Sequence, residues 1–331
     1  MSPQDIQKHI FEQIAQKIKP RKLAPELGEA LNMAQGSVYR RINGETLISF
    51  EESIKLMQRY DIPLDHLTDP TVVIFRLPSL AVQPKSIYEY LSQTEKNLGV
   101  LAQSAECILR YAAVEIPFYY YLPFPHLAAF KFFMWGRTLW HSNRGKYAKF
   151  NFEEYTKDAS LQMLMKRIVE LNCQIQTEEI WNDYMLDITY RQILYCYKAG
   201  LIERKEDVEI LLADINKLIK HIESVAETGQ KTKDKMCAPI QIWDNELFQN
   251  AMFILSETVE EKQYYSSIDV PYFMVSSDVN AYEVGFNFFN RIKTFSNEIT
   301  SANELNRSNF FKRLQQKTAI YEQDLSGEFA K

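Results

Sequence analysis

Glycine is scarce in this sequence, with ten residues among 331. A sheet-dominated fold with many tight turns needs more glycine than this, and so do the glycine-rich loops that surround phosphate groups. The phosphate-binding patterns G-x-x-x-x-G-K-[ST] and G-x-G-x-x-G are absent, as is the nucleophile pattern G-x-S-x-G. Because no catalytic group of residues stands out, we do not expect an enzyme.

Cysteine and histidine are also few, and neither forms a metal-binding pattern. The four cysteines are widely spaced without a C-x-x-C pair, and no H-x-x-x-H pair occurs. This spacing argues against a disulfide framework and a zinc site, and it favours a reducing compartment. We therefore expect no metal and no cofactor. The cysteines are Cys107, Cys173, Cys196 and Cys237.

Long apolar runs are missing as well. The longest apolar region, residues 116–135, is interrupted by three prolines, a histidine and a lysine, whereas a membrane-spanning helix needs about 18 apolar residues. The first ten residues lack the basic-then-apolar order of a signal peptide. The net charge of −5 gives no overall attraction to polyanions. We expect a cytoplasmic protein without a membrane partner, in which any nucleic-acid surface is local.

Helical periodicity is clearest in the first 67 residues. In the first segment, four isoleucines recur at four-residue steps, which is the spacing of one face of an amphipathic helix. Asn43-Gly44 ends the third segment, and Ser49 with Glu52 forms a capping box that opens the fourth. The predicted helical segments are 5–18, 25–31, 34–42, 50–60 and a short turn at 63–67.

The second and third segments have the spacing of a helix-turn-helix. This motif needs a small residue inside its first helix, here Gly28, and a turn residue that tolerates the left-handed conformation, here Asn32. Apolar side chains must anchor both helices, and these are Leu27, Leu31, Met33, Val38 and Ile42. The remaining residues of the second helix are then left for its outer and flanking faces. They are Gln35, Gly36, Ser37, Tyr39, Arg40 and Arg41.

These remaining side chains suit contact with DNA. Gln35, Ser37 and Arg40 can hydrogen-bond base edges, as glutamine does with adenine and arginine with guanine. Lys22, Tyr39 and Arg41 can contact phosphates. Residues 8–41 carry seven lysines and arginines against three glutamates, a local charge of +4 in a chain whose total is −5. The local excess of positive charge therefore coincides with the motif.

The stretch LGEALNMAQGSVYRRINGE, with the FEESIKLMQRY helix and the PLDHL turn after it, resembles the lambda repressor-like (phage repressor and Cro type) helix-turn-helix domain of prokaryotic regulators. The resemblance covers residues 1–67, about a fifth of the chain. It implies a five-helix domain that binds operator DNA in the major groove, usually as a dimer. In this family, serine or threonine most often caps the recognition helix and glycine usually makes the turn. This sequence departs from the pattern, with Ala34 at the cap and Asn32 in the turn.

The rest of the chain reads as mainly α. Prolines and a short strand-like run, Val72–Phe75, indicate a linker over 68–85. Long helical patterns over 86–234, among them 86–113, 152–175, 178–200 and 206–229, predict a helical bundle or repeat domain. Short β-branched segments between 238 and 276, followed by two helices, predict a small α+β domain over 235–331 with a short antiparallel sheet.

Aromatic residues concentrate between Phe118 and Trp140. They suit a dense core between two helices, or alternatively an effector pocket or dimer interface, since tyrosine and tryptophan are favoured in both. The residues proposed for an effector pocket are Tyr119, Tyr120, Trp135, Trp140 and Trp181.

The expected function is that of a DNA-binding transcriptional regulator that recognises an inverted-repeat operator through residues 34–42 as a homodimer. The region after the linker would supply dimerisation or effector sensing. Two alternatives stay open. One is a peptide- or small-molecule-responsive regulator similar to bacterial quorum-sensing receptors, and the other is a protein–protein interaction module with a degenerate helix-turn-helix.

Overall fold

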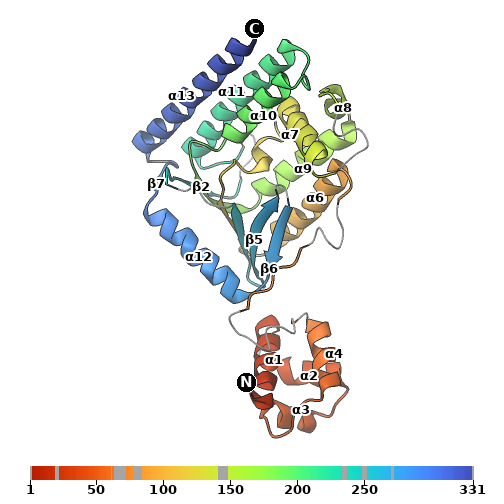
Figure 1. Cartoon of the computed structure of the whole chain (residues 1–331). Helices are drawn as coiled ribbons and strands as arrows, with labels where there is room; N and C mark the ends of the chain where they lie inside the picture. Colours follow the sequence, from red (N-terminus) through yellow and green to blue (C-terminus); the bar gives the residue numbers. More distant parts are fainter. Residues whose placement is uncertain are drawn as a thin grey trace. The chain divides into compact units, whose positions relative to one another are not determined.

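The computed structural model describes residues 2–18, 22–60, 62, 72–77, 84–140, 148–232, 237–247, 252–269 and 272–329. The chain forms two compact units, Met1–Phe75 and Arg76–Lys331 (Figure 1). Among the described residues, no helix has both the length and the apolar character needed to cross a bilayer.

The described residues of the first unit form four helices around a small apolar core. Ile10, Ile14, Leu27, Val38 and Leu56 are all buried in this core. The predicted helical segments up to residue 60 agree with the observed helices within two residues at each end, and the predicted turn at 63–67 lies outside the described residues. The helices are α1 (Pro3–Lys17), α2 (Leu23–Leu31), α3 (Gln35–Ile42) and α4 (Phe50–Tyr60).

The second unit is built on a seven-stranded mixed sheet with the order β6-β5-β4-β1-β2-β3-β7. The central strands β1, β2 and β3 are parallel, β4 to β6 form an antiparallel meander beside β1, and β7 is antiparallel to β3. The strands are β1 (Ile108–Ala112), β2 (Gln176–Trp181), β3 (Ile240–Asp244), β4 (Phe253–Glu257), β5 (Lys262–Asp269), β6 (Tyr272–Ser276) and β7 (Asn297–Glu298).

Helices cover both faces of this sheet. On one face α12 packs on Ala112, Ile180 and Leu255, and in Figure 1 it lies across the strands from α6 and α9. On the other face α6, α7 and α9 pack over Leu109 and Tyr111, while α7, α10, α11 and α13 share a second cluster with β2 and β3. The helices are α6 (Ile87–Gln103), the short 3-10 helix η3 (Phe118–Tyr120), α7 (Pro125–Thr138), α8 (Glu153–Thr156), α9 (Ala159–Cys173), α10 (Asp187–Lys198), α11 (Lys205–Thr228), α12 (Val279–Thr294) and α13 (Glu304–Phe329).

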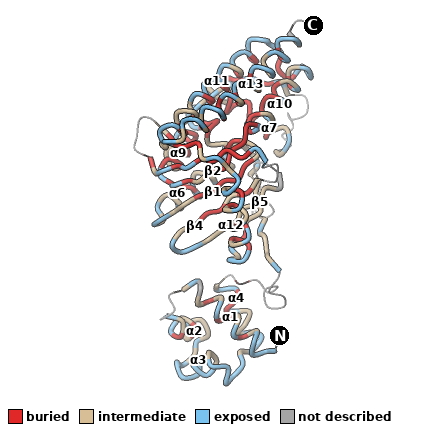
Figure 2. Tube along the Cα trace, turned by 90° about the vertical axis from the view of Figure 1, so that its left-hand side faces the viewer, coloured by how far each residue is buried: buried red, intermediate tan, exposed pale blue. Residues whose placement is uncertain are grey.

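Buried residues lie along β1 and β2 and on the helix faces turned toward them (Figure 2). At the α12 layer, Gly285 allows an especially close approach, because a Cβ at this position would lie 2.6 Å from the ring of Tyr264 on β5. Outside the sheet, the predicted strand-like run Val72–Phe75 is not a strand, but Arg76 after it makes an isolated antiparallel bridge to Val275 of β6.

The prediction of a mainly α fold with only a short antiparallel sheet is wrong. β1 lies within segment 86–113, and four of the six residues of β2 lie within segment 178–200. Each segment was predicted as a single helix, but the two strands are the parallel centre of a seven-stranded sheet. Interior parallel strands are buried on both faces, so their sequences do not alternate between apolar and polar residues. β1 is a short, mostly apolar run beside a long helical pattern, and periodicity cannot tell such a run from helix. β2, with the sequence QTEEIW, is mostly polar and shows no apolar pattern of a strand.

The cysteine spacing argued against a disulfide framework, and the structure corrects this expectation. Cys173 and Cys237 form a disulfide across 64 residues, with their Cα atoms 5.0 Å apart. Cys173 ends α9 just before β2, and Cys237 precedes β3. Because β2 and β3 are parallel neighbours, their starting ends lie side by side, and Ala238 N–H donates to the carbonyl oxygen of Cys173. The strand order therefore creates a pair that spacing in the sequence does not suggest.

Reduction of this disulfide is expected to destabilise the second unit. Closing a loop of this length lowers the entropy of the unfolded chain, which stabilises the fold by about 4 kcal/mol at most. A reductant, or the paired substitution Cys173→Ser and Cys237→Ser, should lower the free energy of unfolding by about 2–4 kcal/mol. Urea unfolding followed by tryptophan fluorescence measures this change, because all four tryptophans lie in the second unit.

Cys107→Ser is the matched control, since Cys107 is a free thiol. It should leave the effect of reductant unchanged. An unfolding midpoint of the unaltered chain that does not move with reductant would contradict the prediction.

Candidate nucleic-acid interface and an internal cavity

The turn between α2 and α3 has the close geometry that a helix-turn-helix needs. Asn32 adopts the left-handed conformation, with φ 53° and ψ 50°. Met33 N–H donates to the carbonyl oxygen of Gly28 at 2.8 Å. A Cβ at Gly28 would lie 3.3 Å from the carbonyl oxygen of Met33 and 3.7 Å from Val38 Cγ2. A side chain at position 28 would therefore require the turn at Met33 to shift by a few tenths of an ångström.

The inner side of α3 is anchored by one apolar and one polar residue. Val38 is 1% exposed and packs in the core of the unit. Gln7 of α1 is also buried, and its amide nitrogen donates to the carbonyl oxygens of Arg41 at 2.6 Å and Thr46 at 3.0 Å. Its amide oxygen accepts from Ile48 N–H at 2.6 Å. Gln7 thus holds the end of α3 and the loop after it.

Sequence reasoning missed this role of Gln7, although a signal for it exists. Gln7 lies one turn before Ile10 and Phe11, on the face of α1 whose apolar residues enter the core. A polar residue at such a position must find hydrogen-bond partners.

The outer side of α3 is open to solvent. Gln35, Gly36, Ser37, Tyr39 and Arg40 are all exposed, and Tyr39 is 53% exposed. A Cβ at Gly36 would meet nothing within 4 Å. The N-cap residue of the helix, Ala34, makes no side-chain capping bond. Lys22, at the start of α2, is exposed as well.

Arg41 differs from its neighbours. Its side chain is only 17% exposed, and Nη2 lies 3.1 Å from Glu52 Oε1. The second oxygen of Glu52 accepts from Ser49 N–H at 2.7 Å, so the same carboxylate caps α4. Arg41 therefore joins α3 to α4, although the sequence suggested a phosphate contact for it.

Three other described cations of the first unit, Lys8, Lys55 and Arg59, have acidic partners. Lys55 lies 2.8 Å from Glu51, and Arg59 lies 2.7 Å from Glu29. In contrast, Arg40 and Lys22 pair with no acidic group among the residues that the structure describes. These two side chains remain available to a polyanion.

The second unit contains a cavity of about 250 Å³. It is lined by α6, by the segment from β1 to α7 and by β4 to β6. Its apolar walls include Leu98, Leu101, Ile116, Phe118, Trp135 and Ile254. The cavity lies over Leu109 and Tyr111 of β1 and extends past the carboxyl end of this strand to Glu115 and Pro117.

A buried ion pair forms part of the cavity wall. Lys131 is 2% exposed, and its ammonium donates to Glu115 Oε1 and, at 3.1 Å, to Gln192 Oε1. Glu115 Oε1 also accepts from the hydroxyls of Tyr121 at 3.1 Å and Thr189 at 3.2 Å. The pair is thus well hydrogen-bonded, as a buried pair must be.

The aromatic residues predicted for an effector pocket separate into two groups. Tyr119 and Trp135 line the cavity, and Trp140 donates from Nε1 to the hydroxyl of Tyr272, another lining residue, at 2.7 Å. Tyr120 and Trp181 do not line it.

Tyr120 and Trp181 instead hold a buried glutamate. The hydroxyl of Tyr120 donates to Glu179 at 3.2 Å, and Trp181 Nε1 donates to it at 2.8 Å. Burial raises the pKa of Glu179. The adjacent tyrosines Tyr119 and Tyr120 therefore belong to different clusters, which the sequence could not distinguish.

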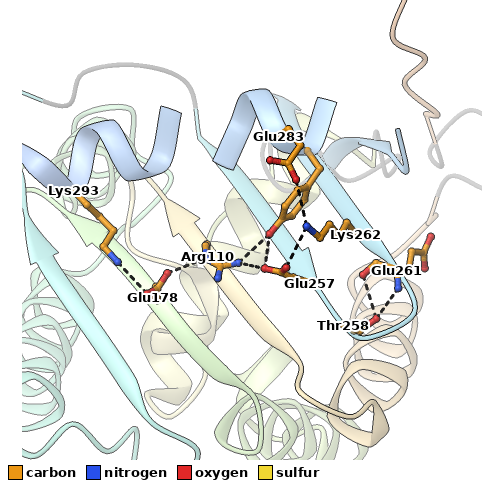
Figure 3. Close-up of polar contacts among 9 residues, drawn as sticks. Arg110, Glu178, Glu257, Thr258, Glu261, Lys262, Glu283 and Lys293 are labelled. Atoms are coloured by element: carbon orange, nitrogen blue, oxygen red, sulfur yellow. Dashed lines mark hydrogen bonds and ion pairs between the residues drawn. The ribbon is translucent and has the colours of Figure 1, made fainter. Parts of the chain in front are cut away.

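The opposite face of the sheet carries a chain of ion pairs under α12 (Figure 3). Arg110 lies between Glu178, at 2.8 Å, and Glu257, at 2.7 Å, and also donates to the Tyr282 hydroxyl at 3.0 Å. Lys293 of α12 lies 3.0 Å from Glu178, and Lys262 contacts both Glu257 and Glu283. The three cations and three carboxylates balance, so this chain of charges fastens α12 to the sheet.

A second group of charges fastens α13. Asp183 follows β2 and lies 3.3 Å from Arg313 and 2.9 Å from Lys317. Asp244 at the end of β3 also pairs with Arg313. Within the described parts of the chain, no group of three or more histidine, cysteine or acidic side chains has the geometry to hold a metal ion.

Two surfaces thus stand out for function: the exposed side of α3 and the aromatic cavity. Comparisons of this chain with protein-family models, with curated proteins and with solved structures find no match.

Proposed function

We propose that this protein is a sequence-specific DNA-binding transcriptional regulator that reads its operator through α3. The observation that carries the proposal is the division of α3 into two sides. Val38 and the bonds from Gln7 hold the inner side. On the outer side, the side chains of Ser37 and Arg40 have no hydrogen-bond or ion-pair partner among the described residues, and a Cβ at Gly36 would meet nothing within 4 Å. The left-handed Asn32 supports the same interpretation, because it gives α2 and α3 the tight turn of a lambda repressor-like motif.

The chemistry of the outer side suits the major groove of DNA. An α-helix fits this groove, where arginine can donate two hydrogen bonds to guanine and glutamine can pair with adenine. Arg40, Gln35 and Ser37 are assigned to base edges. Gly36 has no side chain, so the backbone can approach the DNA closely at this point. Tyr39 and Lys22 are assigned to phosphates, which fix the position of the helix without reading sequence.

A single small domain of this kind gives little specific affinity alone. We therefore propose that two copies bind an inverted repeat, with the second unit supplying the dimer contact. A regulator acts where its operator lies, and on this ground we assign the protein to the cytoplasm. The proposal needs no catalytic chemistry.

Replacement of Arg40 tests base readout. The operator is first selected from a pool of genomic fragments with the full chain. Arg40→Ala should then weaken operator binding about 5- to 150-fold, which corresponds to the 1–3 kcal/mol of one bidentate base contact. Binding to random duplex should fall much less. Fluorescence anisotropy at one fixed salt concentration measures both.

Lys55→Ala is the matched control, because Lys55 is an exposed cation on α4 that already pairs with Glu51. It should leave the affinity for the operator unchanged. If the unaltered chain shows no salt-dependent binding to any duplex, the first unit is an interaction module and the proposal fails.

Replacement of Lys22 should affect all sequences alike. Loss of one phosphate contact releases one fewer counterion on binding, so Lys22→Ala should reduce the slope of log K against log salt by about 0.9 for operator and random duplex together. A salt titration of binding to both duplexes provides the measurement. A loss confined to the operator would instead place Lys22 at a base edge.

The two adjacent arginines should behave differently in the protein without DNA. Arg41→Met leaves Glu52 without its partner and should destabilise the first unit by about 1–3 kcal/mol, whereas Arg40→Met should change its stability by less than about 0.5 kcal/mol. Hydrogen exchange of peptides from α3 and α4, followed by mass spectrometry in the full chain, reports this difference. Equal exchange rates in the two variants would argue against the structural role of Arg41.

A further inference from the structure

The cavity of the second unit has no role in the proposed DNA contact. Small molecules bind in concave, mostly apolar pockets that carry a few placed polar groups. An engineered apolar cavity of about 150 Å³ binds benzene, and the present cavity, at about 250 Å³, has room for two fused rings. We propose that it is the binding site of a small, uncharged, planar and mostly apolar molecule that carries one hydrogen-bond donor.

The position of the cavity supports a binding role. β1 has parallel β2 on one side and antiparallel β4 on the other. The chain proceeds from β1 to β2 and β3 in one direction and returns to the far side of β1 for β4. In open α/β sheets, ligands bind outside the carboxyl ends of strands at such a change of direction. The cavity extends from Leu109 and Tyr111 of β1 past the carboxyl end of this strand to Glu115 and Pro117.

The walls select a flat ring. Tyr90, Phe118 and Trp135 lie around one side of the cavity and meet edge to face, with ring centres 5.7 Å apart for Tyr90 and Trp135 and 6.1 Å apart for Phe118 and Trp135. Aromatic side chains in this arrangement offer both faces and edges to a further ring. Aliphatic side chains, such as Leu98 and Leu101, close the space from α6.

The charges of the wall select an uncharged molecule. Glu115 and Lys131 are the charged residues among the described side chains that line the cavity, and they pair with each other. Their charges cancel, so an ion that entered would have no counter-charge in an apolar space, at a large cost in free energy. A neutral molecule avoids this cost.

Glu115 provides the polar anchor. Its Oε1 atom already accepts from Lys131, Tyr121 and Thr189. Its Oε2 atom has no hydrogen-bond partner among the residues that the structure describes, and Glu115 lines the cavity. A carboxylate oxygen in this state accepts strongly from a hydroxyl or an N–H group. The ligand therefore carries such a donor at the end that meets Glu115.

Tyr119 adds a donor from the wall. Its hydroxyl accepts from Tyr111 at 3.1 Å, and burial raises its pKa to about 12. The phenol therefore keeps its proton at neutral pH and can donate it to an acceptor on the ligand.

A series of four probes on the full chain tests the inference by calorimetry, without DNA. The probes are 1-naphthol, 1-methoxynaphthalene, naphthalene and 1-naphthoate, which share the ring system and differ in the donor and the charge. We expect 1-naphthol to bind at least about tenfold more tightly than each of the others. Equal affinity for 1-naphthol and 1-methoxynaphthalene, or no binding of any probe, would overturn the proposal.

Two substitutions locate the site. Leu101→Trp fills the cavity and should abolish the binding of 1-naphthol, while Leu212→Trp, at a partly buried leucine of α11 that does not line the cavity, should leave it unchanged. Thermal unfolding establishes that each variant folds, and the probe series on the unaltered chain tests the proposal independently of both. Retention of binding by a folded Leu101→Trp variant would place the site elsewhere and refute the assignment.

Glu115→Gln supplies a sharper test, because it removes the negative charge while keeping the size of the side chain. The charge of Lys131 is then uncompensated at the wall. The preference should therefore reverse, with 1-naphthoate binding more tightly than 1-naphthol. An unchanged order of affinities in this variant would contradict the role given to Glu115. Since no DNA is present, these results are independent of the outcome for α3.

Discussion

The second unit depends on the position of one strand. β1 is paired on both edges and buried on both faces, so each of its side chains must be accommodated inside the protein. On one face Arg110 is neutralised by Glu178 and Glu257 and attaches α12 to the sheet (Figure 3). On the other face the Tyr111 hydroxyl bonds to Tyr119 in the cavity wall. The same strand therefore holds the helix layer and shapes the cavity.

Three of the buried or partly buried cations follow one rule. A charge removed from water must be compensated by a partner, because its loss of hydration is otherwise too costly. Arg110, Lys131 and Arg41 each satisfy this rule by pairing with a glutamate. Arg40 and Lys22 face water instead and need no partner. This contrast separates the cations that stabilise the fold from those that we propose to contact DNA.

The helices of the first 60 residues could be predicted from the sequence because their signals are local, such as the four-residue steps of isoleucine in α1 and the capping box of α4. β1 and β2 could not, since strands buried on both faces lack alternation. Within the candidate sites, the exposed residues of α3 could be inferred from helical spacing. The pairing of Arg41 with Glu52 could not, because the loop after α3 determines it.

The sequence by itself determined the helix boundaries near the amino terminus and the left-handed turn at Asn32, since both rest on contacts within a few residues. Only the tertiary structure decided which distant residues meet: Cys173 with Cys237, Glu115 with Lys131, and Tyr119 rather than Tyr120 at the cavity. The order of the strands brings Cys173 and Cys237, 64 residues apart, to the same end of the sheet. The path of the chain from β1 into α7 brings Glu115 against Lys131 and Tyr119 to the cavity. The physical reason is that no local pattern in the sequence encodes either arrangement.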